Sequence, residues 1–266
     1  MPWVMRGLRD GIVTSRYPRR PDGYGLTFRA AVSIRSDDTT VVGTGRAVDA
    51  VAAACPTRAI TSEVRQVRVD RGKCILCGRC VAQRPEDFAF DPDIETAALR
   101  RDLLVVPGRN EDLAGLAELR EELARRVRAF RRSIHVRHLD CGSDGTEEWE
   151  IAALTNPIYD IQRLGVFFTA SPRHADLLLV TGAGAAGMLG PLRETYEAMP
   201  APKVVVAVGS DAASGGLFAG TYATRGGIGD EIAVDVFIPG SPPSPFSIMH
   251  GILLAIGLLP IDTRAR

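Results

Sequence analysis

Lysine is nearly absent from this chain of 266 residues: only Lys73 and Lys203 occur, and arginine supplies almost all of the positive charge. Acidic and basic residues balance to a formal net charge of zero, which excludes a general electrostatic attraction to nucleic acid or to an anionic membrane. The abundance of arginine, alanine, glycine and valine is typical of a GC-rich genome rather than of a binding surface.

Long hydrophobic runs are also missing. The longest apolar stretch near the C-terminus, residues 252–259, is far shorter than the roughly 20 residues that a bilayer-spanning helix needs, and we expect it to be the buried end of a helix. No secretory signal opens the chain. The remaining composition, with 45% hydrophobic and 24% charged residues, is ordinary for a soluble protein, and the length suits two compact domains.

Cysteine is scarce, and four of the five cysteines stand in one spaced pattern. Cys74, Cys77 and Cys80 form a C-x₂-C-x₂-C run, and Cys55 is followed directly by Pro56. This pattern resembles one half of a two-cluster bacterial ferredoxin, in which each C-x₂-C-x₂-C-x₃-C-P run gives three thiolates to one cluster and its last cysteine to the other. We therefore predict one [4Fe–4S] cluster, held by Cys55, Cys74, Cys77 and Cys80.

A two-cluster ferredoxin has four further cysteines that this chain lacks, and all four would be ligands of the second cluster. Its missing cysteines fall on Gly45, Val48, Val51 and Arg84, the last of which is still followed by Pro85. This distribution is expected when one cluster site is lost and its partner is kept. Two alternatives to the cluster stay open: a structural zinc ion on four thiolates, which the spacing favours less than a cubane, and a set of disulfides, which clustered cysteines in a cytosolic protein do not favour.

The chain divides into three parts by its sequence pattern. Residues 1–100 hold the four cysteines among short apolar runs and turn formers, and we predict a ferredoxin-like α+β domain there. Residues 101–132 are predicted to be a linker. Within it, apolar residues recur at three- and four-residue spacing from Glu111 to Arg132, which predicts an amphipathic helix. This helix joins the two domains or docks a partner, or it is a connector packed on its own protein, which is the commoner case. Residues 133–266 alternate strand-like and helical segments.

This alternation predicts an α/β flavodoxin-like domain with a mainly parallel sheet, since continuous apolar runs are typical of buried parallel strands. The predicted strands are residues 134–139, 165–170, 176–181, 203–208 and 233–238, and the predicted helices lie near residues 149–154, 189–199 and 246–259. Glycine-rich or proline-rich loops are predicted after the first, fourth and fifth strands, at residues 140–148, 209–216 and 239–245. In open α/β sheets such loops face the cofactor site.

Residues 182–187 match the dinucleotide-binding pattern G-x-G-x-x-G. They follow the third predicted strand rather than the first, and no acidic residue follows at the distance that a ribose contact requires. We therefore reject a nicotinamide site.

Three segments of the second domain carry a specific resemblance. They are Ser133–Asp140 (SIHVRHLD), Ala170–Asp176 (ASPRHAD) and Pro239–Pro243 (PGSPP). They resemble the small electron-transfer subunit that complex I, the NADH-quinone oxidoreductase, shares with the energy-converting [NiFe] hydrogenases. The resemblance implies loops that carry four cysteine ligands of a terminal [4Fe–4S] cluster.

In this chain the four family cysteines fall on Asp144, Glu147, Asp211 and Ser241. Cys141 lies just upstream of the first of these positions and does not match it. Loss of all four thiolates leaves only hard oxygen donors, so we predict no cluster in the second domain. The carboxylates there are either a hard-cation site for Mg²⁺, Ca²⁺ or Mn²⁺ or solvated remnants of the former ligand loops.

The first domain resembles the ferredoxin-like subunit of the same complexes, and residues 4–18 resemble its membrane-proximal leader. The chain is thus similar to a fusion of two adjacent subunits that has kept one of three clusters. By analogy with the family, His174 is a candidate proton relay at a quinone-facing site, although structural histidines are commoner. We expect His135 and His138 to be packing or hydrogen-bonding residues.

We therefore expect an iron–sulfur electron-transfer subunit of a complex I-like or group 4 [NiFe] hydrogenase-like oxidoreductase, with no catalytic residue of its own. The expected partners are a large hydrogenase-like or quinone-binding subunit and antiporter-like membrane subunits, and no nucleic acid. The expected location is the cytoplasmic face of the cell membrane, reached only through those partners. Two alternatives stay open: a redox-inactive structural or assembly subunit with a purely structural cluster, and a free-standing ferredoxin carrier.

Overall fold

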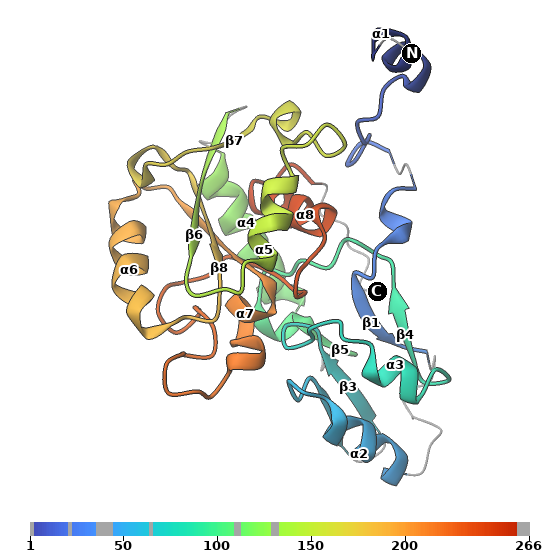
Figure 1. Cartoon of the computed structure of the whole chain (residues 1–266). Helices are drawn as coiled ribbons and strands as arrows, with labels where there is room; N and C mark the ends of the chain where they lie inside the picture. The colour runs from blue at the N-terminus through green and yellow to red at the C-terminus, as the bar shows by residue number, and fades with distance from the viewer. Residues whose placement is uncertain are drawn as a thin grey trace.

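The computed structural model describes residues 3–20, 23–35, 45–63, 66–108, 113–128 and 133–259. A parallel α/β unit forms the C-terminal half, and two small antiparallel sheets form the N-terminal part (Figure 1). No helix in these ranges combines the length and the hydrophobicity needed to cross a membrane.

A five-stranded parallel sheet forms the centre of the C-terminal half. Its strands are β6 (Ile134–Asp140), β7 (Val166–Phe168), β8 (Leu177–Thr181), β9 (Val204–Val208) and β10 (Val236–Ile238). They lie in the order β10-β9-β8-β6-β7, and every neighbouring pair is parallel. This is the flavodoxin-like order, in which the chain reverses its direction across the sheet after the first two strands. The predicted strands and the parallel α/β fold are confirmed.

Helices cover both faces of this sheet because its central strands are apolar on both sides. Helices α4 (Leu113–Val127), α5 (Thr146–Ala153) and α8 (Pro245–Ala255) share one core with Leu177 and Leu179 of β8. Helix α6 (Leu189–Ala198) shares the opposite core with Leu178 and Val180. Successive β8 residues thus point to opposite faces.

The predicted amphipathic helix is confirmed over the 15 residues of α4. Leu116, Leu123 and Val127 form its buried face. The two ends of the prediction, at Glu111 and Arg132, lie outside the described residues.

One predicted loop is wrong. The segment after β9, expected to be a loop over residues 209–216, begins directly with a short helix, α7 (Gly209–Ser214). Gly209 has a φ of 90°, a left-handed conformation that turns the chain sharply from the strand into the helix and that glycine adopts without steric cost. Helix α7 therefore sits at the carboxyl end of β9.

The N-terminal part contains two small antiparallel sheets. Strand β1 (Ala31–Ile34) pairs with β4 (Phe88–Asp91), and β2 (Ile60–Glu63) pairs with β3 (Gln66–Asp70). Helix α2 (Gly45–Ala54) lies between β1 and β2 in the chain, and α3 (Arg79–Gln83) lies between β3 and β4. Strand β5 (Val105–Val106), inside the segment predicted to be a linker, pairs with β3 and extends the second sheet.

The first residues of the chain reach across to the C-terminal half. Helix α1 (Trp3–Asp10) stands away from the body and buries no residue (Figure 1). Farther along, the backbone N–H of Ser15 donates to Ile158 O at 2.7 Å. The rings of Tyr17 and Phe28 pack edge-on against Phe246 of α8. The N-terminal segment and the parallel domain therefore share one apolar contact.

Candidate metal centre

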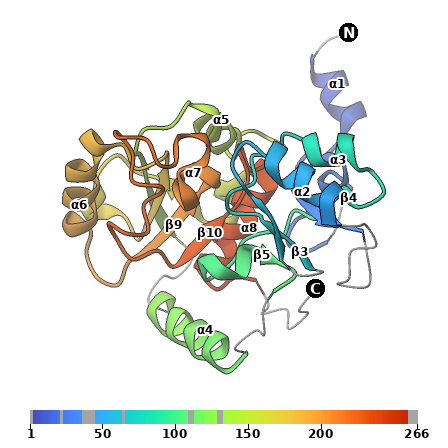
Figure 2. The ribbon, with the colours of Figure 1, turned by 90° about the horizontal axis from the view of Figure 1, so that it is seen from below.

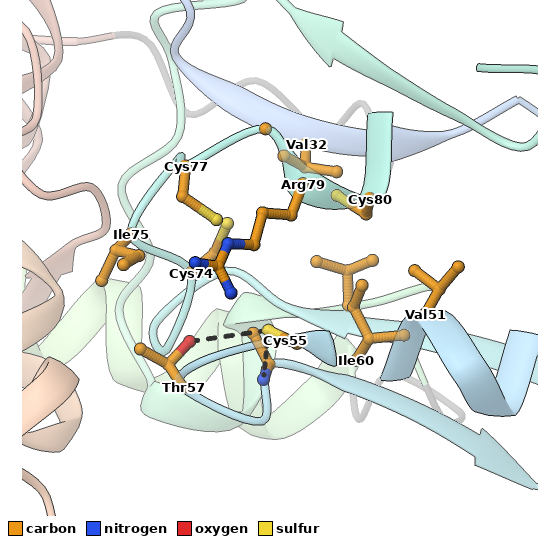
Figure 3. A pocket seen from close by; sticks show the side chains of 13 residues that line it. Val32, Val51, Cys55, Thr57, Ile60, Cys74, Ile75, Cys77, Arg79 and Cys80 are labelled. Carbon is orange, nitrogen blue, oxygen red and sulfur yellow. Dashed lines mark hydrogen bonds between the residues drawn. The ribbon is translucent and has the colours of Figure 1, made fainter. Parts of the chain in front are cut away.

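The four cysteines of the ferredoxin-like pattern line one pocket in the N-terminal part of the molecule. Cys55 follows α2, Cys74 and Cys77 lie on the loop between β3 and α3, and Cys80 lies in the first turn of α3. Figure 3 shows their side chains around the same space, with the side chain of Arg79 extending between them. The fold thus brings the lone cysteine and the cysteine triplet together.

The loop from Cys74 to Cys80 has the tight turns that such an arrangement requires. Leu76 and Gly78 have positive φ values of 54° and 73°. A Cβ at Gly78 would lie 2.9 Å from the ring of Phe90, so only glycine lets the loop pass this close to β4. These two left-handed residues turn the three cysteines of the loop toward one pocket.

The surroundings of the cysteines are apolar and oppose the charged form of the thiols. Val32, Val51 and Ile60 are buried beside them. Burial, reinforced by the other three cysteines, raises the pKa of Cys74 to about 12, and burial also raises the pKa of Cys80. Metals bind the thiolate, so a positively charged group has to offset the free-energy cost of ionising these buried thiols.

A backbone donor and a hydroxyl lie close to the sulfur of Cys55. The N–H of Ala59 donates to Cys55 Sγ at 3.3 Å, and Thr57 Oγ1 lies 3.8 Å from the same sulfur. Hydrogen bonds to sulfur tune iron–sulfur clusters, and four soft thiol donors suit iron and sulfide. The residues present therefore fit the predicted cluster. Among the described residues, no three His, Cys, Asp or Glu side chains are placed to hold a single metal ion.

Two positions where the ferredoxin pattern would place further cysteines make other contacts. Val51 is 3% exposed within the apolar core of the N-terminal part. Arg84 Nε lies 2.5 Å from Asp87 Oδ2 and 3.2 Å from Glu86 Oε1. The side chains of the other two positions, Gly45 and Val48, lie outside the described part of the chain.

The four positions where the resemblance places lost cysteines gather at the carboxyl end of the parallel sheet. They are Asp144, just before α5, Glu147 in its first turn, Asp211 on α7 and Ser241 after β10. The N–H of Ser210 donates to Gly240 O at 2.6 Å, which holds α7 beside the loop after β10. Asp144 is exposed, whereas Glu147 and Asp211 are 0% and 4% exposed. The two buried acids are therefore not solvated remnants of ligand loops.

The cysteine loop docks directly on α7, a contact that no sequence signal indicated. Ser210 Oγ donates to Cys74 O at 2.7 Å, and Figure 2 shows α7 facing the N-terminal part. Arg101 donates to both carboxylate oxygens of Asp70, at 2.7 and 3.0 Å, and its Nε donates to Ala213 O at 2.9 Å. Helix α7 therefore joins the pocket of the four cysteines to the buried acids.

The remaining sequence candidates lie apart from this pocket. Cys141 is fully buried, and burial raises its pKa to about 12. His174 is exposed, and His135 Nδ1 lies 3.7 Å from Asp176 Oδ2. His138 Nε2 lies 3.1 Å from Thr181 Oγ1, which is the hydrogen-bonding role predicted for it.

Known proteins match parts of this chain. The family described as "NADH ubiquinone oxidoreductase, 20 Kd subunit" matches residues 144–255. Formate hydrogenlyase subunit 7 of Escherichia coli strain K12 is 37% identical over 151 residues, which cover 57% of this chain and 58% of that protein. A probable membrane-bound hydrogenase subunit of Pyrococcus furiosus is 40% identical over 138 residues, which cover 52% of this chain and 83% of that protein.

A third relative, a subunit of the NADH-quinone oxidoreductase of Citrifermentans bemidjiense, is 45% identical over 95 residues, which cover 36% of this chain and 55% of that protein. The chain thus spans little more than half the length of the Escherichia and Citrifermentans relatives. The relatives are named as subunits of hydrogenases and of NADH-quinone oxidoreductase, which agrees with the resemblance seen in the three sequence segments. Given the match at residues 144–255 and 40% identity across 83% of the Pyrococcus subunit, the chain belongs to the family of the NADH ubiquinone oxidoreductase 20 kDa subunit.

Proposed function

We propose that the chain is an iron–sulfur electron-transfer subunit of a complex I-like or group 4 [NiFe] hydrogenase-like oxidoreductase associated with a membrane. The observation that carries the proposal is the single pocket lined by Cys55, Cys74, Cys77 and Cys80. These residues hold one [4Fe–4S] cluster, which supplies single-electron transfer when bound. Residues 1–100 are the ferredoxin-like domain, residues 101–132 the linker, and residues 133–266 the docking domain without a cluster.

The order of elements in the N-terminal part supports the ferredoxin-like domain and the fusion. Strands and helices follow one another as β1, α2, β2, β3, α3 and β4, the β-α-β-β-α-β order of ferredoxin-like units. Cys55 comes from the first half of this unit and the cysteine triplet from the second half. The family match begins at residue 144, so the cysteines lie outside the matched segment, as a fusion of two subunits requires.

The placement of the thiols supports a cluster rather than zinc. A zinc ion lies about 2.3 Å from each sulfur, so its cysteine ligands crowd within about 4 Å of one another. Among the described residues, no three potential ligands are gathered in that way. Four thiols that line one pocket suit a polynuclear group, which takes one thiolate at each of four irons.

The exposure of the four cysteines suggests how electrons reach the pocket. Cys77 is exposed, which leaves one side open to the approach of a partner's redox group. On the other side, the backbone of Cys74 contacts α7 of the docking domain. The proposed partners are a large hydrogenase-like or quinone-binding subunit and antiporter-like membrane subunits, which place the chain on the cytoplasmic face of the cell membrane.

A redox-inactive structural or assembly subunit is the second candidate. It is favoured by the oxygen donors at Asp144, Glu147, Asp211 and Ser241, since a relay through the second domain needs another carrier there. The two candidates differ in whether electrons enter and leave the N-terminal cluster when the partner subunits are present.

Metal analysis of the full chain after anaerobic purification tests the proposal. We expect about four irons and four acid-labile sulfides per chain, and one reducible cluster in low-temperature electron paramagnetic resonance. Eight irons would show that the second domain also holds a cluster, and zinc without sulfide would replace the cluster altogether. A cluster that is present but is not reduced and reoxidised in the complex with its partners would favour the structural subunit.

A further inference from the structure

Two acids at the carboxyl end of the parallel sheet are buried. Glu147 is 0% exposed and Asp211 is 4% exposed. Within the described ranges, Glu147 Oε1 has no hydrogen-bond partner, and no arginine, lysine or histidine forms an ion pair with either acid. Two carboxylates enclosed in this way remain ionised only at a high free-energy cost, so the site calls for a bound cation or a proton.

The backbone of α7 and the turn after it close tightly over both carboxyl groups. A Cβ at Gly209 would lie 2.6 Å from Glu147 Oε1. A Cβ at Gly216, where φ is 51°, would overlap Asp211 Oδ1. Among the described residues no three acids converge as ligands of one metal ion, and a cationic side chain from a partner cannot reach an oxygen that is enclosed. A proton is the ligand that fits.

Thr146 connects the buried site to the surface. Its Oγ1 lies 2.6 Å from Asp144 Oδ1 and 3.0 Å from Glu147 Oε2. A threonine hydroxyl has one proton, so it donates to only one of the two acids. It donates at the shorter distance to Asp144, whose Oδ1 also accepts the N–H of Thr146 at 3.0 Å. The contact with Glu147 is then a hydrogen bond only if Glu147 carries a proton on Oε2.

We propose that Glu147 carries a proton and exchanges it with water along a short path through Thr146 and Asp144. The Glu147 O–H donates to Thr146 Oγ1, and the Thr146 O–H donates to Asp144. On release, the hydroxyl proton of Thr146 passes to Asp144 and then to water, while the proton of Glu147 moves to Thr146. One proton leaves, Glu147 becomes a carboxylate, and uptake follows the reverse order.

The titratable groups that face the buried pair from neighbouring elements favour this assignment. Burial, with Asp211 and Asp144 adding to it, raises the pKa of Glu147 to about 7. Burial, with Asp144 and Glu148 adding to it, raises the pKa of Asp211 to about 6. His138 of β6 lies 3.7 Å from Glu148, and its burial lowers its pKa, which favours a neutral ring. Hydrogen bonds lower the pKa of Asp144, so this acid is the ionised, outer end of the path.

Infrared spectroscopy of the full-length chain tests the proposal, and it does so whether or not the N-terminal part carries a cluster. We expect a C=O band of a buried, protonated carboxyl group that disappears as the pH rises through about 7 and that is missing from Glu147→Gln. Thr146→Val should keep the band but slow its shift in D₂O at least several-fold, because the hydroxyl bridge to Asp144 is gone. Glu194→Gln, which changes an exposed acid on α6, is the matched control and should alter neither property.

Three outcomes would overturn the proposal. A parent chain without a protonated carboxyl band at about pH 6 would show that Glu147 is ionised. Deuterium exchange in Thr146→Val as fast as in the parent would remove the path. If Glu147→Gln does not fold, carbon-13 labelling of glutamate in the parent decides the assignment, because the band then shifts if it belongs to Glu147 and stays in place if it belongs to an aspartate.

Discussion

Cys77 is the exposed member of the four cysteines around the pocket, and Cys141 is buried apart from them. Cys77→Ser replaces a soft ligand with a hard one, so we expect most of the cluster absorbance to be lost and the N-terminal part to be destabilised. Cys141→Ser should leave the spectrum unchanged. Visible absorbance and circular dichroism of the two variants provide the measurement, and loss of the cluster in Cys141→Ser would contradict the ligand set.

Glu147 links the stability of the second domain to pH. Its pKa is raised to about 7 in the folded chain, from an ordinary value of 4.5, so the folded state keeps a proton that the unfolded chain releases within this window. Stability should therefore fall as the pH rises from about 5 to about 7, by up to about 3 kcal/mol for this group. Urea unfolding at several pH values measures the effect.

The variants used in the infrared experiment separate the contribution of Glu147 from that of other acids. Glu147→Gln stays neutral at every pH, so its stability should vary less with pH than that of the parent. Glu194→Gln should keep the full dependence, because Glu194 is exposed. Identical curves for the parent and Glu147→Gln would show that Glu147 has no raised pKa.

Sequence predicts only those parts of the candidate site that are formed by residues close together in the chain. The spacing of Cys74, Cys77 and Cys80 indicates cluster ligation by itself, because three ligands on one short loop need no knowledge of the rest of the fold. The hydrogen bonds of Thr146 depend on how α5 meets α7. Nothing in the spacing of Asp144, Thr146 and Glu147 indicates which oxygens face the same hydroxyl or that Glu147 is enclosed.

At the scale of single elements, α8 depends on the residue that precedes it. Ser244 accepts the N–H of Ser247 at 3.1 Å, and Pro245 occupies the first helical position. Ser244→Ala removes this cap and should lower the free energy of unfolding by about 1 kcal/mol. Ser244→Asn restores an acceptor and should recover most of the loss, as measured by the midpoint of urea unfolding. Equal losses in both variants would show that the cap is not the cause.

The strands of the second domain were predictable because burial on both faces leaves a continuous apolar run. The segments Leu177–Thr181 and Val204–Val208 are buried at every position. Helix α7 was missed because its sequence, GSDAAS, has no apolar period and begins with glycine. Its helical form depends on long-range contacts with the cysteine loop and with the loop after β10, such as those of Ser210.

At the scale of the whole molecule, Phe246 connects the N-terminal segment to the parallel domain. It is 1% exposed and meets the rings of Tyr17 and Tyr159, with centroid distances of 6.0 and 4.9 Å. Phe246→Ala should cost about 3–5 kcal/mol of stability and speed amide hydrogen exchange around Tyr17. Phe218→Ala, at a residue that is 44% exposed, should cost about 0.5 kcal/mol or less. Unchanged exchange around Tyr17 in Phe246→Ala would contradict this role.

The sequence pattern changes near residue 100, but residues before this point already contact the parallel sheet. Ala98 exchanges two backbone hydrogen bonds with Phe237, at 2.9 and 2.8 Å, so the chain before the linker already covers the β10 edge of the parallel sheet. Sequence periodicity predicts the elements of each part, but it carries no information on pairings between residues so far apart in the chain. The ferredoxin-like domain and the linker boundaries stay predictions.

The aromatic contact at Phe246 also sets an order of events during synthesis. Tyr17 and Phe28 leave the ribosome more than 200 residues before Phe246. Contacts that span nearly the whole chain form late, because every intervening residue must first be translated and then ordered. The cysteine loop, whose three cysteines are close in sequence, can reach its local fold long before. The N-terminal segment of the nascent chain therefore stays without its aromatic partner until α8 has been synthesised.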